Sequence, residues 1–298
     1  MKIILSIFTF LLFSIQIPNN KLYSTVDEVH ESNSIYYHMI DYSRLEDLNI
    51  QLPYVYEYSN DTKSILVFGS YHTSNPKDKL INNIESRFNL FEPDIVLYEG
   101  DGISFESTAD MSIRYYFEMG FVRYLCNEKQ IIDTNLEPSS SSKYEYLLKK
   151  YSKYEVFLAD IGSQISLLLN SNINYDSFDF KKKYNLYIKN FIDDGFPITD
   201  LEKDIDYFYK IYKSFYGIEF NLRTFDYKTV EVKYNSTVLN KINQESAKYR
   251  DIYMLKMVKK LLSEYNRIYI QIGGRHAIIW EPFIKNIISN YSNSKRKK

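Results

Sequence analysis

Cysteine is almost absent from this sequence. The chain has 298 residues and a single cysteine, Cys126, so no disulfide can form within it. Its fold must therefore be stabilised by a hydrophobic core, and a chain of this length is ample to build one. Cys126 lies in the apolar stretch FVRYLCNE, where we predict a buried small residue rather than a nucleophile.

An excess of either charge is also missing. The 37 Lys and Arg balance 38 Asp and Glu, which argues against the strongly basic face that nucleic-acid binding needs. Hydrophobic residues make up 45% and charged residues 25%, ordinary values that exclude a disordered chain and a multi-span membrane protein. The sequence has no HExxH, CxxC, Walker loop, GxSxG or strand-following GxGxxG, which excludes HExxH zinc proteases, nucleotide-binding domains and the usual α/β-hydrolases.

The N-terminus carries the most apolar stretch. Lys2 precedes the run from Ile3 to Ile17, and Pro18 follows it. A basic start, an apolar run and a helix-ending proline are typical of a secretory signal peptide, and the run is shorter than the roughly 20 residues that span a bilayer. We predict a signal peptide over residues 1–24 and a secreted or periplasmic protein, with no other stable membrane partner. An uncleaved anchor is the alternative.

Beyond the signal, residues 25–60 predict a polar lead-in with one helix, and residues 61–298 predict an α/β domain. SILVFGS and DIVLYEG are short, buried strand patterns on either side of a helical segment, which is a strand–helix–strand unit with parallel strands. A third strand is predicted near IIDTNL and a last one at RIYIQIGG. We expect a central, mainly parallel sheet flanked by helices, with a helical insertion at about 144–235, where apolar residues recur at helical spacing.

Two of the four histidines follow predicted strands, each with a glycine three residues earlier. They are His72 in GSYH and His276 in GGRH. Ligands of an open α/β sheet bind beyond the C-terminal ends of its strands, and a glycine there would let the backbone turn and present the imidazole. The pair could share a metal or act as acid and base; alternatively, each fills a turn. We expect His276 at the rim, so that His276→Ala hardly changes stability.

Two further residues are candidates for the same site. Glu99 ends the strand DIVLYEG, and a carboxylate there is costly unless it is paired, solvated or functional. We expect its strand to lie next to the one that ends at His72. Arg250 belongs to a long predicted helix before the last strand; an arginine on a helix usually faces solvent.

These motifs together resemble the TraB/TIKI and erythromycin-esterase/ChaN-like superfamily. The matching residues are GSYH with His72, PDIVLYEG with Glu99, YRDIYML with Arg250 and QIGGRH with His276. The stretch FEMGFVRYLCNEKQIIDTNLEP, with Glu118, Arg123 and Glu137, also resembles the family. The resemblance covers about 64–140 and 236–290. It implies an α/β fold whose helical insertion covers the strand ends, and a His, Glu, Arg and His site in which Arg250 takes part.

The resemblance implies several activities. TIKI-like members are metal-dependent peptidases, the erythromycin esterases hydrolyse a lactone without a required metal, and ChaN-like members bind haem or iron. We therefore predict an exported hydrolase that cleaves a peptide or ester bond in a peptide or small molecule, with a divalent metal on His72, Glu99 and His276. In this reading His72 or Glu99 activates water, Arg250 stabilises the oxyanion, and His276 is a ligand or the general acid. A haem- or iron-binding protein without turnover is the alternative.

Overall fold

The computed structural model describes residues 26–46, 48, 50–169 and 178–295. The predicted signal peptide, residues 1–24, lies outside the described residues. Within these ranges, no helix is both long and apolar enough to cross a membrane.

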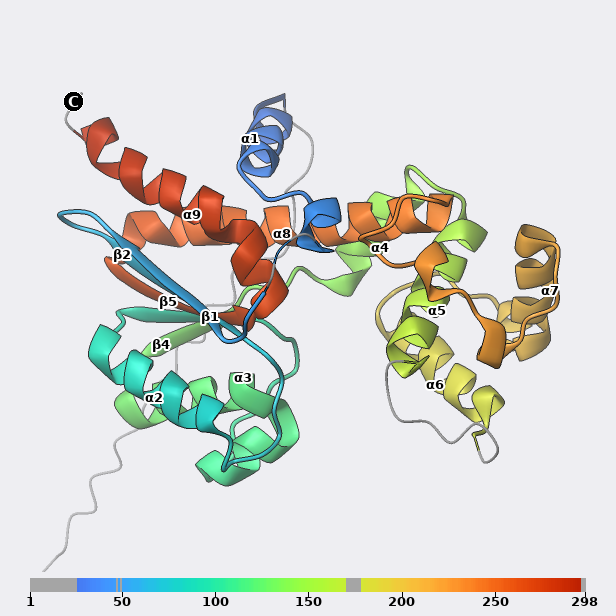
Figure 1. Cartoon of the computed structure of the whole chain (residues 1–298), viewed down its shortest axis with the longest axis horizontal. Coiled ribbons are helices and arrows are strands. Elements are labelled where there is room, and N and C mark those ends of the chain that lie inside the picture. Colours follow the sequence, from blue (N-terminus) through green and yellow to red (C-terminus); the bar gives the residue numbers. More distant parts are fainter. Residues whose placement is uncertain (1–25, 47, 49, 170–177, 296–298) are drawn as a thin grey trace, which may run out of the picture.

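A five-stranded sheet forms the centre of the fold (Figure 1), with strands in the order β1-β2-β5-β3-β4. The contacts of β2, β5, β3 and β4 with one another are all parallel, and only β1 runs antiparallel, at the edge. The predicted α/β class and mainly parallel sheet are thus confirmed. The strands are β1 (Tyr54–Ser59), β2 (Ser64–Ser70), β3 (Ile95–Tyr98), β4 (Ile132–Asn135) and β5 (Arg267–Gly273).

Strand β1 lies inside the range predicted as a polar lead-in, so the α/β domain begins before residue 61. Its sequence YVYEYS has few aliphatic residues, but its tyrosines share one face by strand alternation. Tyr56 OH donates to the carbonyl of Ala277 at 3.0 Å, and Tyr58 OH donates to Glu281 at 2.7 Å. These tyrosines hold the edge strand against helix α9 (Gly274–Lys295).

Strand β5 lies between β2 and β3, so the expectation that Glu99 ends a strand next to that of His72 is wrong. The last strand in sequence is the centre of the sheet, buried on both faces from Ile268 to Ile272. Parallel β5 pairs with β2 on one side and with β3 on the other. The strand of His276 therefore separates those of His72 and Glu99.

Helices cover both faces of the sheet (Figure 1). On one face α8 (Val238–Glu264) and α9 pack on one set of alternating strand residues, and on the other α2 (Lys79–Phe91) and α3 (Ala109–Lys129) pack on the other set. Strand β2 shows the alternation, since Ile65 and Val67 belong to the first core and Leu66 and Phe68 to the second. Outside these layers, α1 (Val26–Tyr37) packs on α8, followed by the short 3-10 helix η1 (Tyr42–Glu46).

Gly69 is required for close packing rather than for a turn. A Cβ at this position would lie 2.5 Å from that of Ala277 and 2.9 Å from the carbonyl oxygen of Tyr54. The described glycines with positive φ do not include Gly69 or Gly273. The glycine before His72 is therefore explained by the close approach of α9 to the end of β2. The expectation that a glycine is needed there for a turn of the backbone is wrong.

The insertion is helical and has its own hydrophobic core. That core contains Leu239 and Ile242 of α8 but no strand residue. Figure 1 shows the insertion as a lobe beside the sheet, and its first helix, α4, packs on α8, where Tyr249 OH donates to Ser142 Oγ at 2.8 Å. Its elements are α4 (Ser140–Leu148), α5 (Lys153–Leu169), α6 (Phe180–Asp193), η2 (Asp200–Lys203), α7 (Ile205–Tyr216), η3 (Leu222–Thr224) and η4 (Tyr227–Thr229).

Candidate functional site

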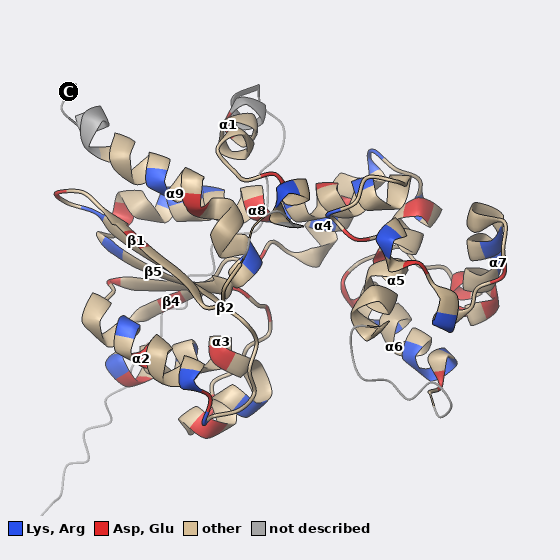
Figure 2. Ribbon diagram, viewed as in Figure 1, with Lys and Arg blue, Asp and Glu red and all other residues tan. Residues whose placement is uncertain are grey.

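The parallel strands deliver polar side chains to one edge of the sheet. Ser70, at the end of β2, pairs with Gly273, at the end of β5, and Tyr98, at the end of β3, pairs with Gln271. Beyond these strand ends come His72, His276 and Glu99, and Glu137 follows β4. Lysine, arginine and acidic residues are elsewhere mixed over both the sheet layers and the lobe (Figure 2).

Arg250 of α8 joins three of these groups. Its Nη2 donates to Glu99 Oε1 at 2.5 Å, its Nε donates to Glu137 Oε2 at 2.7 Å, and its Nη1 lies 2.9 Å from His276 Nε2. Nη2 also donates to Glu137 Oε1, which makes that pair bidentate. Burial would lower the pKa of Arg250, but the hydrogen bonds and charges of Glu137 and Glu99 raise it. Three of the four predicted site residues, Glu99, Arg250 and His276, are thus in direct contact.

Glu99 is held as a carboxylate. Burial opposes its ionisation, but the charge of His276 when that ring is protonated, the charge of Arg250 and a hydrogen bond from the Gly273 N–H lower its pKa to about 2. That N–H donates to Oε2 at 2.6 Å, next to the first residue of α9. Both oxygens of Glu99 are therefore engaged, and its low pKa makes it a weak base.

His276 is fixed by a buried carboxylate. Its Nδ1 lies 2.5 Å from Oδ1 of Asp251, which has no exposed side-chain surface. Asp251 also accepts from Trp280 Nε1 at 2.7 Å and from the hydroxyl of Tyr42. Since the Arg250 guanidinium can only donate, His276 Nε2 is the acceptor in that contact and Nδ1 carries the proton. We assign this tautomer from the hydrogen-bond network.

The expectation of a rim position for His276 is wrong. Only 12% of its side chain is exposed. Helix α9 begins directly at the end of β5, and this places the imidazole in contact with Arg250. The prediction that His276→Ala hardly changes stability depended on that rim position and loses its basis. Losing the bond to buried Asp251 should cost about 1–3 kcal/mol.

The pKa of His276 is raised, which favours a second ring proton, whereas the contact with Arg250 requires Nε2 to be unprotonated. Burial would lower its pKa, but the charge of Asp251, the Asp251 hydrogen bond and the charge of Glu99 outweigh burial and Arg250, and the pKa is raised. A proton on Nε2 could face Glu99 Oε1 at 3.8 Å, although only if Arg250 Nη1 moves to another acceptor. His276 can therefore gain a proton when Arg250 is drawn away.

His72 has the same carboxylate arrangement. Its Nδ1 lies 2.8 Å from Oε1 of Glu118, a fully buried residue of α3. Glu118 also accepts from Ser70 Oγ at 3.0 Å and from the Thr73 N–H at 3.1 Å. Gln271 in turn donates to Ser70 Oγ at 2.9 Å, which ties this network to the centre of β5. Both histidines thus use Nδ1 on a buried carboxylate, and Nε2 of His72 is left for chemistry, whereas Nε2 of His276 accepts from Arg250.

His72 is the exposed member of the site. Its side chain is 63% exposed, and nothing places it in hydrogen-bonding contact with Glu99, Arg250 or His276. It is linked to them by charge: the Glu118 hydrogen bond, the Glu118 charge and the Glu99 charge together raise its pKa against the opposing effect of burial. The four predicted residues therefore form a triad in direct contact, with a second histidine dyad within electrostatic range of it.

The predicted metal site does not fit these residues. Between Glu99 and His276 the guanidinium of Arg250 already occupies the position of a cation, donating to both candidate ligand atoms. Among the side chains that the structure describes, no group of three or more His, Cys, Asp or Glu could hold a metal ion. A metal on His72, Glu99 and His276 would first have to displace Arg250.

Three further residues belong to the site, although the sequence had given them no role in it: Glu118, Glu137 and Asp251. Glu137 comes two residues after the end of β4, so the rule that selected Glu99 would also have selected it. Nothing local marks Glu118 or Asp251, because both are defined by a histidine distant in sequence. Arg123, in the stretch that resembles the family, lies elsewhere: its Nε donates to Asp133 at 2.8 Å and its guanidinium stacks on Phe105.

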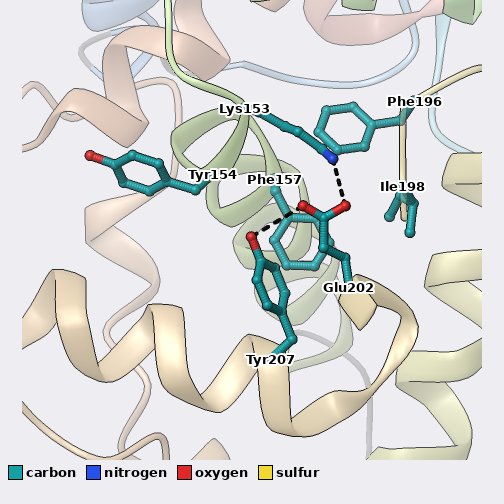
Figure 3. Close-up of a pocket in the computed structure, with 7 residues that line it drawn as sticks. All are labelled: Lys153, Tyr154, Phe157, Phe196, Ile198, Glu202 and Tyr207. Atoms are coloured by element: carbon teal, nitrogen blue, oxygen red, sulfur yellow. Dashed lines mark hydrogen bonds and ion pairs between the residues drawn. The ribbon is translucent and has the colours of Figure 1, made fainter. Parts of the chain in front are cut away.

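The insertion contains a separate pocket, which is mainly aromatic (Figure 3). Its charged pair is Lys153 and Glu202, at 2.5 Å, and Tyr207 OH donates to the other oxygen of Glu202 at 3.4 Å. Glu202 also closes a capping box with Thr199 at the start of η2, so its role is explained by local structure. The pocket is lined by Lys153, Tyr154, Phe157, Phe196, Ile198, Glu202 and Tyr207.

Comparisons of this chain with family models, with curated proteins and with solved structures find no match.

Proposed function

We propose that the protein is a hydrolase that cleaves an ester or peptide bond with His72 as the general base. The observation that carries this proposal is the pair of histidines at neighbouring strand ends, each with Nδ1 on a fully buried carboxylate. A carboxylate in this position fixes the imidazole tautomer and stabilises the imidazolium that forms when Nε2 takes a proton. One such histidine is exposed, and the other is in contact with the partly buried guanidinium of Arg250.

In the proposed reaction, His72 Nε2 takes a proton from water, and the hydroxide attacks the carbonyl carbon of the substrate. Exposure of His72 favours this role over Glu99, whose two oxygens are engaged. The carbonyl oxygen becomes negative and accepts from Arg250 Nη1, an interaction stronger in the transition state than in the ground state.

His276 then supplies the leaving-group proton. Once Nη1 of Arg250 turns to the oxyanion, Nε2 of His276 loses its donor and takes a proton from solvent, which its raised pKa favours. Collapse of the tetrahedral intermediate breaks the bond to the leaving group, which takes this proton. His276 is then neutral again, and His72 returns its own proton to solvent, so both residues end as they began.

A substrate panel tests this function. Purified protein, incubated with esters and short peptides, should hydrolyse members of the panel, and a strong chelator should leave the rate unchanged because Arg250 supplies the positive charge. The alternative, a haem- or iron-binding protein, predicts no turnover together with a Soret band or stoichiometric iron. A colourless protein without any hydrolytic activity would contradict both functions.

The proposed setting is outside the cytoplasm, as the N-terminal sequence predicts, and the substrate is a small molecule or peptide. Separating the purified extracellular or periplasmic fraction from the cytosol and detecting the processed chain by mass spectrometry tests the setting. Full-length protein confined to the cytosol would contradict it.

A further inference from the structure

Helix α3 is interrupted directly beside His72. Tyr116 and Phe117 leave the helical conformation, and Phe117 has φ 57° and ψ −155°. Residues with a side chain rarely adopt this backbone conformation, which glycine populates readily. A phenylalanine at this position is therefore held there at a cost in stability.

The interruption is built into the surrounding sequence. Three residues later, a Cβ at Gly120 would lie 2.5 Å from the carbonyl oxygen of Ser112 and 2.6 Å from Cβ of Tyr116. Only a glycine allows the first half of α3 to approach the second this closely. The kink is thus accommodated by a second residue and is not confined to Phe117.

The kink positions two side chains at the site. Glu118, the next residue, is fully buried and holds Nδ1 of His72. The ring of Phe117 lies 6.0 Å from the imidazole of His72, centroid to centroid, at an interplanar angle of 56°. Phe117 is nevertheless 45% exposed, so its burial in the core does not explain why a large apolar residue occupies a strained position.

We propose that Phe117 determines substrate specificity, its ring forming one wall of a subsite for an apolar group next to the bond that His72 hydrolyses. This inference rests on the proposed function and adds the substrate class: esters or amides whose acyl part is an aliphatic or aromatic group. Contact with the ring removes apolar surface of both partners from water, which is the driving force for binding at such a wall.

The test compares p-nitrophenyl acetate with p-nitrophenyl hexanoate. Wild type should favour the hexanoate in kcat/KM by about tenfold or more. Phe117→Ala and Phe117→Gly should bring the ratio of the two kcat/KM values close to one, and Phe117→Leu should retain most of the preference. An unchanged preference in the Ala and Gly variants would overturn the inference.

A binding measurement separates this inference from the proposed function. Hexanoate anion, and not acetate, should shift the ring NMR signals of His72 in wild type but not in Phe117→Ala. If it does so in a protein that hydrolyses neither ester, the hydrolase proposal fails and the subsite remains. If hexanoate leaves His72 unaffected in wild type, the subsite is wrong, whatever the hydrolysis data show.

Thermal melts test the backbone part of the argument. Glycine normally destabilises a helical segment relative to alanine, but at a strained position of positive φ the order should reverse. Phe117→Gly should therefore melt at a higher temperature than Phe117→Ala. The opposite order, with the Gly variant melting well below wild type, would show that Phe117 serves packing and would overturn its assignment to specificity.

Discussion

The sheet edge and the helical insertion each contain a partly buried glutamate with a pKa of about 2, but the causes of the low pKa differ. Glu99 at the sheet edge owes its low pKa, against burial, to the charges of His276 and Arg250, which arrive from distant parts of the chain. Glu202 in the insertion owes its low pKa, also against burial, to hydrogen bonds from Lys153 and from Thr199 only three residues away. A shifted pKa alone therefore does not identify a functional site; what distinguishes Glu99 is that a histidine and an arginine converge on it.

Catalytic activity should separate the two regions most strongly. His72→Asn should reduce hydrolysis on the order of 10²–10⁴-fold, as loss of a general base does. Lys153→Met in the insertion pocket should leave the rate within about twofold of wild type, as expected of a residue that supports only local structure. Steady-state kinetics on the best substrate of the panel measure both.

His38→Asn is the matched control for this comparison, since His38 lies just after α1 and away from the strand ends. It should behave as wild type. Equal losses in the two histidine variants, or a larger loss for Lys153→Met than for His72→Asn, would contradict the assignment of the site.

Stability should show the next largest difference. Arg250→Met leaves Glu99 and Glu137, each with about 15% of its side chain exposed or less, without their shared cation, and should lower the free energy of unfolding by about 3 kcal/mol. Lys153→Met removes a partner that is 34% exposed and should cost about 1 kcal/mol or less. Urea denaturation at neutral pH compares the two; equal losses would mean that Arg250 does not hold the site together.

Acid should affect the two regions alike. The pKa of Glu99 is about 2 in the folded chain against 4.5 for an ordinary glutamate, so its stabilisation is fully present above pH 4.5 and is lost as the pH falls toward 2. The difference is equivalent to about 3 kcal/mol. Glu99→Gln and Glu202→Gln should each lose less stability than wild type between pH 5 and pH 2. An effect in only one variant would show that one of the two causes is misassigned.

The smallest expected effect is a shift of a single pKa. Glu118→Gln removes the charge that raises the pKa of His72 and weakens the hydrogen bond to its Nδ1, so that pKa should fall and the rise of activity with pH should move to lower pH. The pKa of His276, on a different carboxylate, should not change. NMR titration of the histidine rings checks both; a fall for His276 alone would contradict the assigned dyads.

Much of the sheet could be predicted from sequence because its strands are short, apolar and followed by glycine or polar residues. Strand β1 could not be predicted, since its alternating residues are tyrosines rather than the aliphatic residues typical of a core strand. The position of β5 between β2 and β3 was also hidden, because strand order depends on how the chain returns after a long insertion.

Part of the site could be predicted from sequence, because the ends of the strands could be. Glu99 and His276 follow strands, and any parallel sheet brings its strand ends together. The partners Asp251 and Glu118 could not be predicted, because the role of each buried carboxylate depends on a histidine that the fold places beside it. The metal expected from the resemblance is opposed by Arg250, whose contact with both ligand atoms depends on the packing of α8 over the strand ends.

The coupling of the two histidines through Glu99 is the central claim, and one titration tests it directly. The charge of Glu99 raises the pKa of both His72 and His276. Glu99→Gln should therefore lower both values in an NMR titration of the histidine rings, whereas Glu202→Gln should change neither. A Glu99→Gln variant in which the pKa of His72 stays at its wild-type value would show that the two histidines do not share a site.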